Sequence, residues 1–134
     1  MELGLRYAID LPRQGHDAAL YLDFRAARRW LLNNARDANV LNLFAYTCGA
    51  GVAALAGGAA SVTNVDFSES ALATGSRTAA LNSLDPARFV QAVHMFVLNS
   101  PTHPLFSHMS HPVYPICQKL ILFCCFFCPR ASRE

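Results

Sequence analysis

The feature that most constrains the fold of this chain is a glycine-containing bend that joins an apolar run to a run of small residues. Residues 40–46 (VLNLFAY) are mostly apolar, as in a buried strand, and Thr47–Gly51 is turn-like. Residues 52–56 are small and apolar, and two glycines end the run. A second apolar run follows at residues 61–65. Strand, bend, helix and strand in this order predict a parallel βαβ unit.

The sequence predicts one helix on each side of this unit. Apolar residues recur at helical spacing from Phe24 to Ala35, and Asp23 before them is the expected N-cap. Ser68 is the expected N-cap of a helix that runs to about Leu81, with Leu72 and Leu81 on its buried side.

Two further strands are expected outside the unit. Residues 5–11 alternate weakly, and a third core strand begins at Phe89 and continues to Ala92. The fold class is therefore α/β, with about three parallel strands and flanking helices.

The bend and Asp66 are the candidate functional residues. Ligands of parallel sheets bind beyond the carboxyl ends of the strands, where both lie. Glycine lets a ligand approach the backbone, and a helix N-terminus offers free N–H groups. Asp66 is an acceptor suited to two neighbouring ribose hydroxyls. The sequence therefore predicts a site for a nucleoside-containing cofactor.

The spacing alone leaves more than one ligand open. Residues 49–54 (GAGVAA) also fit the dinucleotide fingerprint, and Asp66 follows Gly49 by 17 positions (66 − 49). A fragment of an NAD-binding oxidoreductase is one alternative. Glycines that serve only the packing of an alanine-rich helix are another.

Four segments resemble the class I S-adenosylmethionine-dependent methyltransferases, a family that includes bacterial large-subunit ribosomal RNA methyltransferases. They lie in the family's order, within residues 4 to 92, and read GHDAALYLDFR (15–25), VLNLFAYTCGAGVAALAGGA (40–59), VTNVDFSESAL (62–72) and NSLDPAR (82–88). The resemblance implies a Rossmann-like methyltransferase fold, S-adenosyl-L-methionine as cofactor and ribosomal RNA as substrate.

The resemblance also implies a set of cofactor-binding residues. Phe44, Tyr46, Thr47 and Gly49 would line the methionine and ribose side of the cofactor. Asp66 would hold the ribose hydroxyls, with Phe67 against the adenine and Ser68 beside it. Asp23 and Arg25 would close the pocket from the N-terminal side. No catalytic residue and no metal ligand is assigned.

The chain departs from the family pattern at several positions. The family usually has Gln where Phe24 stands, and Gly where Ala19 and Cys48 stand. Cys48 is expected to be a small filler and not a nucleophile, because no basic residue adjoins it. The acidic residue that the family places after the third strand, and its Asn/Asp-Pro-Pro segment, do not occur here.

The sequence divides near residue 92, where the periodicity is lost. We expect residues 1–92 to form a partial methyltransferase domain, truncated and inactive as this chain, and residues 93–134 to be an irregular, disordered or aberrant tail outside the family. The apolar run at 120–128 is expected to be exposed unless a partner covers it. A non-catalytic pseudoenzyme or interaction module is therefore a further alternative. Histidines and cysteines of the tail are a weak metal candidate.

Composition restricts the partners and the compartment. The net charge is +2, too small to indicate nucleic acid by bulk electrostatics. Arg25, Arg28 and Arg29 share one face of the predicted helix, either as a solvated face or as one that meets phosphates. Five cysteines without a signal peptide predict an intracellular, reducing compartment. The longest apolar run, nine residues at 120–128, predicts no membrane span. The oligomeric state is not predicted.

Overall fold

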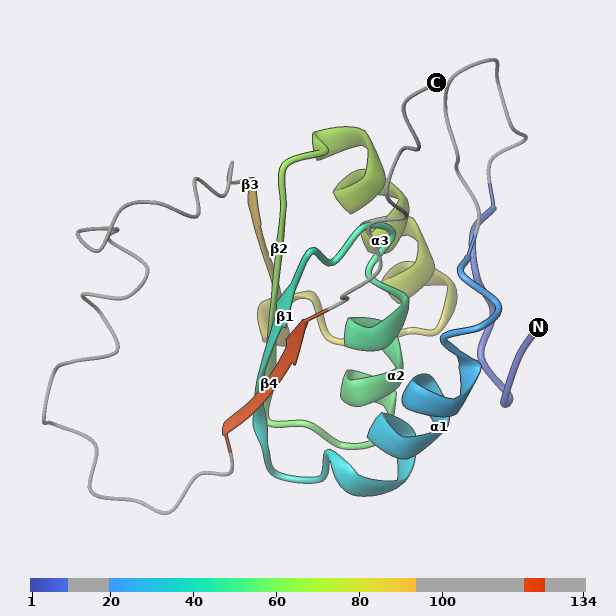
Figure 1. Cartoon of the computed structure of the whole chain (residues 1–134), viewed down its shortest axis with the longest axis vertical. Coiled ribbons are helices and arrows are strands. Elements are labelled where there is room, and N and C mark those ends of the chain that lie inside the picture. The colour runs from blue at the N-terminus through green and yellow to red at the C-terminus, as the bar shows by residue number, and fades with distance from the viewer. Residues whose placement is uncertain (10–19, 94–119, 125–134) are drawn as a thin grey trace, which may run out of the picture.

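The centre of the molecule is a parallel sheet with strand order β3-β2-β1-β4. We describe residues 1–9, 20–93 and, for the backbone only, 120–124 of a computed structural model. The strands are β1 (Asn39–Leu43), β2 (Ser61–Asp66), β3 (Phe89–Val93) and β4 (Leu120–Cys124). Each neighbouring pair is parallel (Figure 1). The predicted α/β class and the three parallel core strands are confirmed.

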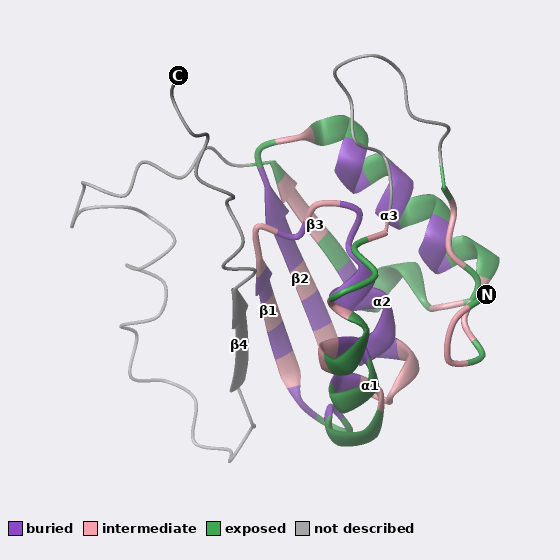
Figure 2. Cartoon of the chain, turned by 45° about the vertical axis from the view of Figure 1, so that its right-hand side comes forward, coloured by how far each residue is buried: buried purple, intermediate pink, exposed green. Residues whose placement is uncertain are grey.

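Three helices cover one face of this sheet (Figures 1 and 2). They are α1 (Arg25–Asn34), α2 (Gly49–Ala56) and α3 (Glu69–Leu81), and a short 3-10 turn, η1 (Pro86–Arg88), precedes β3. In α2, every residue from Gly49 to Leu55 is buried. Since the helix contacts β1, β2, α1 and α3, only small residues fit along most of its surface.

A pair of buried amides sets the distance between α2 and the sheet. Asn42 of β1 and Asn64 of β2 are register partners, and the Asn42 Nδ2 group donates to Asn64 Oδ1 at 2.9 Å. Gly51 lies directly above them, since a Cβ built there would stand 2.1 Å from Asn64 Oδ1. The helix therefore packs closer to the strands than any residue larger than glycine at position 51 allows.

The N-terminal segment crosses the outside of the helix layer (Figure 1). Its Glu2 carboxylate binds the Arg28 guanidinium, with Nε–Oε1 and Nη2–Oε2 distances of 2.6 and 2.9 Å. Further along, the Asn82 side chain accepts from Arg6 N at 2.9 Å and donates to Arg6 O at 2.7 Å. This segment therefore ties α1 to the C-terminal end of α3.

The expected strand at 5–11 is not found in the part of it that is described. Leu5 forms only an isolated antiparallel bridge with Glu2, and residues 10 and 11 lie outside the described ranges. Beyond this bridge, backbone groups of Arg6 and Ala8 bond to side chains of the helix layer, as in the bond from Ala8 N to Thr78 Oγ1 at 3.1 Å.

The helix boundaries were predicted well for α3 and less well for α1. Ser68 caps α3 by accepting from Ala71 N, and the helix ends at Leu81 as expected, although Leu81 is 47% exposed and not buried. Asp23 is not the N-cap of α1. The cap position is Phe24, and no side chain caps it.

The fourth strand was not predicted. We expected residues 93–134 to be irregular, and for six of them this is wrong: Val93 ends β3, and Leu120–Cys124 form β4 beside β1. Residues 94–119 and 125–134 lie outside the described ranges.

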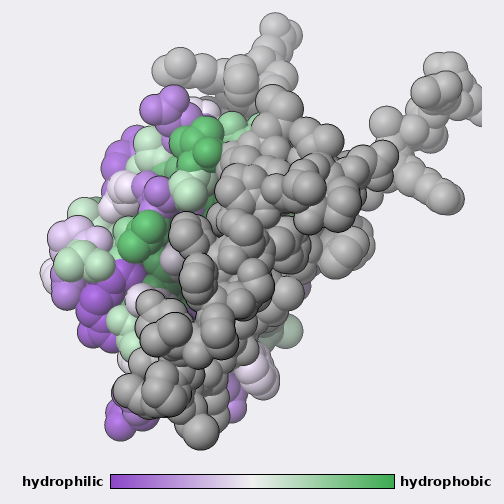
Figure 3. Space-filling view, turned by 90° about the vertical axis from the view of Figure 1, so that its left-hand side faces the viewer, coloured by the Kyte–Doolittle hydropathy of each residue, from purple (hydrophilic) through white to green (hydrophobic). Residues whose placement is uncertain are grey.

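The other edge strand, β3, exposes apolar side chains. Val90 is 47% and Val93 58% exposed. Figure 3 shows apolar residues among hydrophilic ones on this side of the molecule. In the described parts of the chain, no helix has the length and hydrophobicity needed to cross a bilayer.

Candidate cofactor site

The bend between β1 and α2 holds an unusual backbone. Phe44, Tyr46 and Cys48 all have positive φ angles, of 54°, 50° and 58°. L-residues other than Asn and Asp rarely adopt this region, at a cost of roughly 1–2 kcal/mol each. Such strain collects at ligand sites, where the surrounding structure holds it in place.

Asp66 stabilises this bend from the neighbouring strand. Its Oδ2 accepts from Tyr46 N at 2.7 Å, and its Oδ1 accepts from Ser68 N at 2.9 Å. The side chain is buried, with 4% of the residue exposed. One carboxylate therefore joins the ends of β1 and β2, and each oxygen keeps capacity for a further donor.

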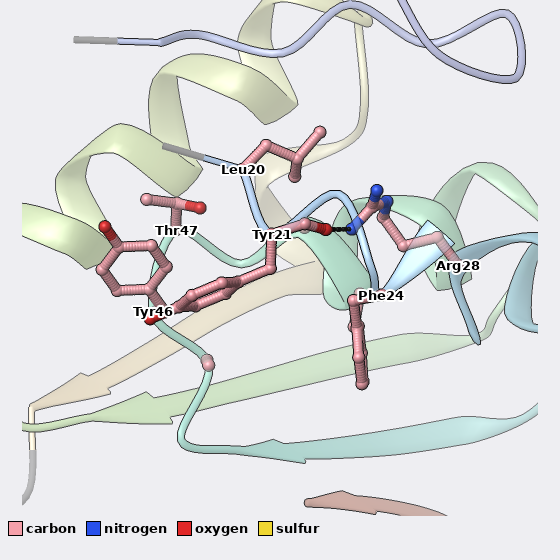
Figure 4. Close-up of a pocket in the computed structure, with 9 residues that line it drawn as sticks. Leu20, Tyr21, Phe24, Arg28, Tyr46 and Thr47 are labelled. Atoms are coloured by element: carbon pink, nitrogen blue, oxygen red, sulfur yellow. Dashed lines mark hydrogen bonds between the residues drawn. The ribbon is translucent and has the colours of Figure 1, made fainter. Parts of the chain in front are cut away.

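A small, open hollow lies beside the bend and the first turn of α2 (Figure 4). No side chain of the described residues caps α2 at Cys48, so the hollow meets free backbone amides. The lining residues are Leu20, Tyr21, Phe24, Arg28, Ala45, Tyr46, Thr47, Gly49 and Ala50.

The outer wall of the hollow comes from the segment before α1. The Tyr21 ring packs on the Tyr46 ring, with centroids 4.9 Å apart and planes at 41°. The Arg28 Nη1 group donates to Tyr21 O at 2.7 Å, as Figure 4 shows. Arg28 thus fixes the wall to α1 and, through Glu2, to the N-terminal segment.

Arg28 has a role that its sequence pattern did not show. We expected it on an arginine face open to solvent or phosphate, but it is 1% exposed. Hydrogen bonding by Arg28 also holds the pKa of Glu2 below its ordinary value. Nothing in the spacing of the arginines distinguishes Arg28 from Arg25 or Arg29, because its partner Glu2 lies 26 residues away.

The structure brings most of the nine predicted cofactor residues to this edge of the sheet. Tyr46, Thr47 and Gly49 line the hollow, and Phe44 begins the bend. Asp66 and Ser68 are joined to it by hydrogen bonds.

Three of the nine lie further out. Phe67 is 67% exposed beside Asp66. Asp23 is exposed, and Arg25 lines a neighbouring hollow with its guanidinium 3.9 Å from Glu2. Sequence reasoning missed Leu20, Tyr21 and Arg28, although the first two lie inside the family-like segment 15–25.

Cys48 is enclosed beneath the bend. Burial raises the pKa of its thiol to about 12, so the thiol is neutral at physiological pH. The Gln91 Nε2 group donates to its sulfur at 3.6 Å, and Gly75 of α3 faces it. Cys48 therefore fills space beneath the bend, as expected.

No group of three or more His, Cys, Asp or Glu side chains that could hold a metal is found among the described residues. The histidines and cysteines singled out in the tail lie outside those ranges.

The fold and site together define a Rossmann-like nucleoside-binding protein, in which a strand ends in a strained bend next to a carboxylate. A family model described as S-adenosylmethionine-dependent methyltransferase matches residues 1–100. The chain belongs to this family. The match extends eight residues (100 − 92) beyond the boundary expected at residue 92.

Curated relatives share this segment. The chain is 48% identical over 88 residues to the ribosomal RNA large subunit methyltransferase I of Tolumonas auensis, covering 64% of this chain and 22% of that protein. It is 51% identical over 69 residues to the methyltransferase K/L of a Psychrobacter species, covering 52% of this chain and 9% of that protein. The chain thus spans about a fifth or less of the length of these relatives.

Solved structures share the fold. A structure described as the methyltransferase SMU.776 complexed with SAH aligns with a TM-score of 0.67 and 36% identity, over 73% of this chain and 26% of that chain. The SAM-dependent methyltransferase of Agrobacterium tumefaciens aligns with a TM-score of 0.62 and 29% identity, over 69% of this chain and 30% of that chain.

Proposed function

We propose that this chain forms the cofactor-binding part of an S-adenosylmethionine-dependent methyltransferase that acts on RNA of the large ribosomal subunit. The observation that carries the proposal is the Asp66 carboxylate, which joins the bend after β1 to the end of β2 beside an uncapped helix N-terminus. The relatives with large-subunit ribosomal RNA methyltransferase names support the substrate class.

The residues at this edge fit the two ends of the cofactor. S-adenosylmethionine carries a ribose with two hydroxyls and a methionine end with a carboxylate. Asp66 keeps acceptor capacity for the hydroxyls, and Thr47 and Gly49 lie at the amino end of α2, where backbone N–H groups and the helix dipole favour an anion. The space above Gly49 is tight, since a Cβ there would stand 2.8 Å from Leu20 Cδ1.

The remaining predicted residues complete the proposed pocket. Phe67 would lie against the adenine with Ser68 beside it, and Phe44 and Tyr46 would shape the ribose side. Asp23 and Arg25 would close the N-terminal side, next to the wall made by Tyr21. The exposed ring of Phe67 has an apolar face of the kind that packs on a nucleobase.

When bound, the cofactor supplies an activated methyl group, so the protein needs to position the two reactants and keep water out. The strained bend and the fixed carboxylate serve positioning, because neither has to reorganise when the ligand arrives. The packed rings of Tyr21 and Tyr46 form an apolar barrier at the wall. The neutral thiol of Cys48 takes no part.

The proposed setting is an intracellular, reducing compartment in which ribosomal RNA is modified. The free, buried thiol of Cys48 supports it, because no cysteine pairing is needed to build this part of the fold.

Isothermal titration of the whole chain with SAH tests the proposal. We expect binding by the natural chain and a loss of at least tenfold in affinity for Asp66→Asn, which removes the charge but keeps the size. Asp85→Asn is the matched control. The Asp85 carboxylate also accepts from a backbone N–H, Ala87 N at 2.9 Å, but it lies before the start of β3, at the opposite ends of the strands from Asp66. Both variants are compared where circular dichroism shows them folded.

Two results would overturn the proposal. One is binding of NAD with no binding of SAH, which favours the oxidoreductase alternative. The other is equal SAH affinity in the Asp66 and Asp85 variants, which would show that Asp66 does not bind the cofactor.

A further inference from the structure

The outer face of α1 combines arginines with an exposed tryptophan. The burial of Arg28 leaves Arg25 and Arg29 on the solvent side of the helix, and Arg36 follows just after its end. On the same side, Trp30 is 50% exposed. Figure 2 shows this face of α1 as largely exposed. We call Arg25, Arg29, Trp30 and Arg36 the α1 face.

The charges of this face do not serve the helix itself. The helix dipole favours acidic residues in the first turn of a helix and basic residues in the last. α1 has neither, and its first turn contains arginines. Arg25 opens the helix at the positive end of that dipole, where a cation is disfavoured. Local choices that oppose stability indicate a functional surface.

The neighbouring carboxylates leave the positive charge in excess. Glu2 is bound by Arg28 through two hydrogen bonds and lies 3.9 Å from Arg25, so it offsets part of the charge at the start of the helix and none at Arg29. Asp23 and Asp37 are exposed at the two ends of the helix, and Asp37 directly follows Arg36. The middle of the α1 face is therefore cationic and suits a chain of phosphates.

Trp30 adds a flat apolar surface to these cations. Its backbone carbonyl accepts from Asn34 Nδ2 at 2.7 Å, which pins the turn on which the ring is carried. Exposed aromatic rings beside arginines bind single strands, because each unpaired base has a π face that stacks. A duplex would offer no free base to this ring.

The α1 face begins at the rim of the cofactor hollow. Phe24 and Arg28 line the hollow, and Arg25 lines the hollow next to it. Tyr21, half exposed on the same wall, stands between the hollow and the start of α1. A strand that delivered a base to the cofactor would thus meet the α1 face on leaving the hollow.

We propose that the α1 face binds single-stranded RNA, with Arg29 and Arg36 on the phosphates and Trp30 stacked on an unpaired base. This inference rests on the proposed RNA substrate and names the surface that holds the RNA outside the hollow.

Trp30 is the only tryptophan of the chain, so its fluorescence reports on this surface alone. The whole chain is titrated with a mixed-sequence, single-stranded RNA 12-mer at several salt concentrations. We expect quenching of the fluorescence and an affinity that falls with salt. The double variant R29Q/R36Q should lower the slope of log K against log salt by about 1.4, since each phosphate contact of a single strand contributes about 0.7.

The matched control is R6Q/R77Q, which removes two exposed arginines at α3 and the N-terminal segment and leaves the same net charge. It should keep the slope of the natural chain. Binding by W30A and W30F is followed by the anisotropy of a labelled RNA. W30A should lose roughly tenfold in affinity, and W30F, which keeps a ring, should lose less.

The outcomes separate this inference from the proposed function. RNA binding that leaves Trp30 unquenched, or that R29Q/R36Q and R6Q/R77Q weaken equally, overturns the α1 face while the RNA substrate stands. Absence of RNA binding by a chain that binds SAH overturns the RNA substrate and this inference together. Parallel titrations with SAH show that R29Q/R36Q retains the fold and the cofactor site.

Discussion

The chain passes from strand to helix twice at the same edge of the sheet, and the two junctions are built in opposite ways. After β2, the β2–α3 junction is regular: Ser68 is extended and its side chain caps the helix. After β1, the β1–α2 junction passes through three non-glycine residues with positive φ and enters α2 at Cys48 without a side-chain cap.

The difference shows where the molecule keeps backbone groups available. The Ser68 hydroxyl accepts a hydrogen bond from a backbone N–H in the first turn of α3, so a local side chain caps that helix. The β1–α2 junction leaves its amides facing a hollow and takes its support from Asp66, which belongs to the other junction. Asp66, at the regular junction, thus stabilises the strained junction by accepting from its Tyr46 N–H.

The largest effect is expected from Asp66→Ala. The change leaves Tyr46 N and Ser68 N without their acceptors, and each lost bond to a charged group costs about 1.5–3 kcal/mol. We expect the free energy of unfolding to fall by about 3 kcal/mol, measured by urea denaturation. Asp85→Ala, which removes one bond at an exposed site, should cost about 1 kcal/mol or less. Equal losses would mean that Asp66 does not join the junctions.

The next effect separates two glycines of the β1–α2 junction. In Gly51→Ala the new Cβ meets the Asn64 amide, which is held between two strands, and the cost is about 2 kcal/mol. In Gly49→Ala it meets only the end of the Leu20 side chain, which can move. Thermal unfolding should show a larger loss of stability for Gly51→Ala than for Gly49→Ala. In SAH titration, Gly49→Ala should lose more binding free energy than it loses free energy of unfolding. The reverse ranking of stabilities would contradict the packing described for α2.

A smaller effect tests the thiol beneath the β1–α2 junction. A Cβ at Gly75 would stand 2.5 Å from Cys48 Sγ, so Gly75→Ala is crowded in the natural chain. In a Cys48→Gly background the crowding is gone, and alanine then favours α3 by about 1 kcal/mol. A double-mutant cycle of unfolding free energies should therefore give a favourable coupling of about 1–2 kcal/mol. Additive changes would show that Cys48 and Gly75 do not restrict each other.

The smallest effect concerns the regular junction. Ser68→Ala removes the cap of α3 and should lower the free energy of unfolding by about 1 kcal/mol. Ser70→Ala is the control, since its exposed hydroxyl contacts Ser68 Oγ at 3.2 Å but caps no amide among the described residues. It removes that contact and leaves the cap, and it should change stability by less than about 0.5 kcal/mol. Coinciding denaturation curves of the two variants would show that the Ser68 side chain does not stabilise the start of α3.

The regular junction could be predicted from the sequence, and the strained one only in outline. Ser68 precedes its helix directly, so the cap is a local signal. The glycines of the bend indicated a close approach, but the positive φ angles fall on Phe44, Tyr46 and Cys48, which have no local preference for them. Tertiary support from Asp66 sets these angles, and no local pattern encodes that support.

Features that depend on distant partners could not be predicted. The burial of Arg28 follows from its pairing with Glu2, and β4 follows from its pairing with β1, far earlier in the chain. Asp23 has the right composition for a cap, yet α1 begins at Arg25 after a turn in which Phe24 N bonds Tyr21 O. In the first two cases a contact between residues far apart in the sequence decides between options that are equal locally, and in the third a local turn shifts the start of the helix.

The clasp between Asn82 and the backbone of Arg6 has a consequence for biosynthesis. The two residues are 76 positions apart, so at about 5–20 residues per second the nascent chain waits roughly 4–15 seconds for the clasp after Arg6 is made. Until then the Asn82 side chain cannot hold the backbone of Arg6. This contact between the two ends of the described helix layer thus forms only after α1, α2 and α3 have all been translated.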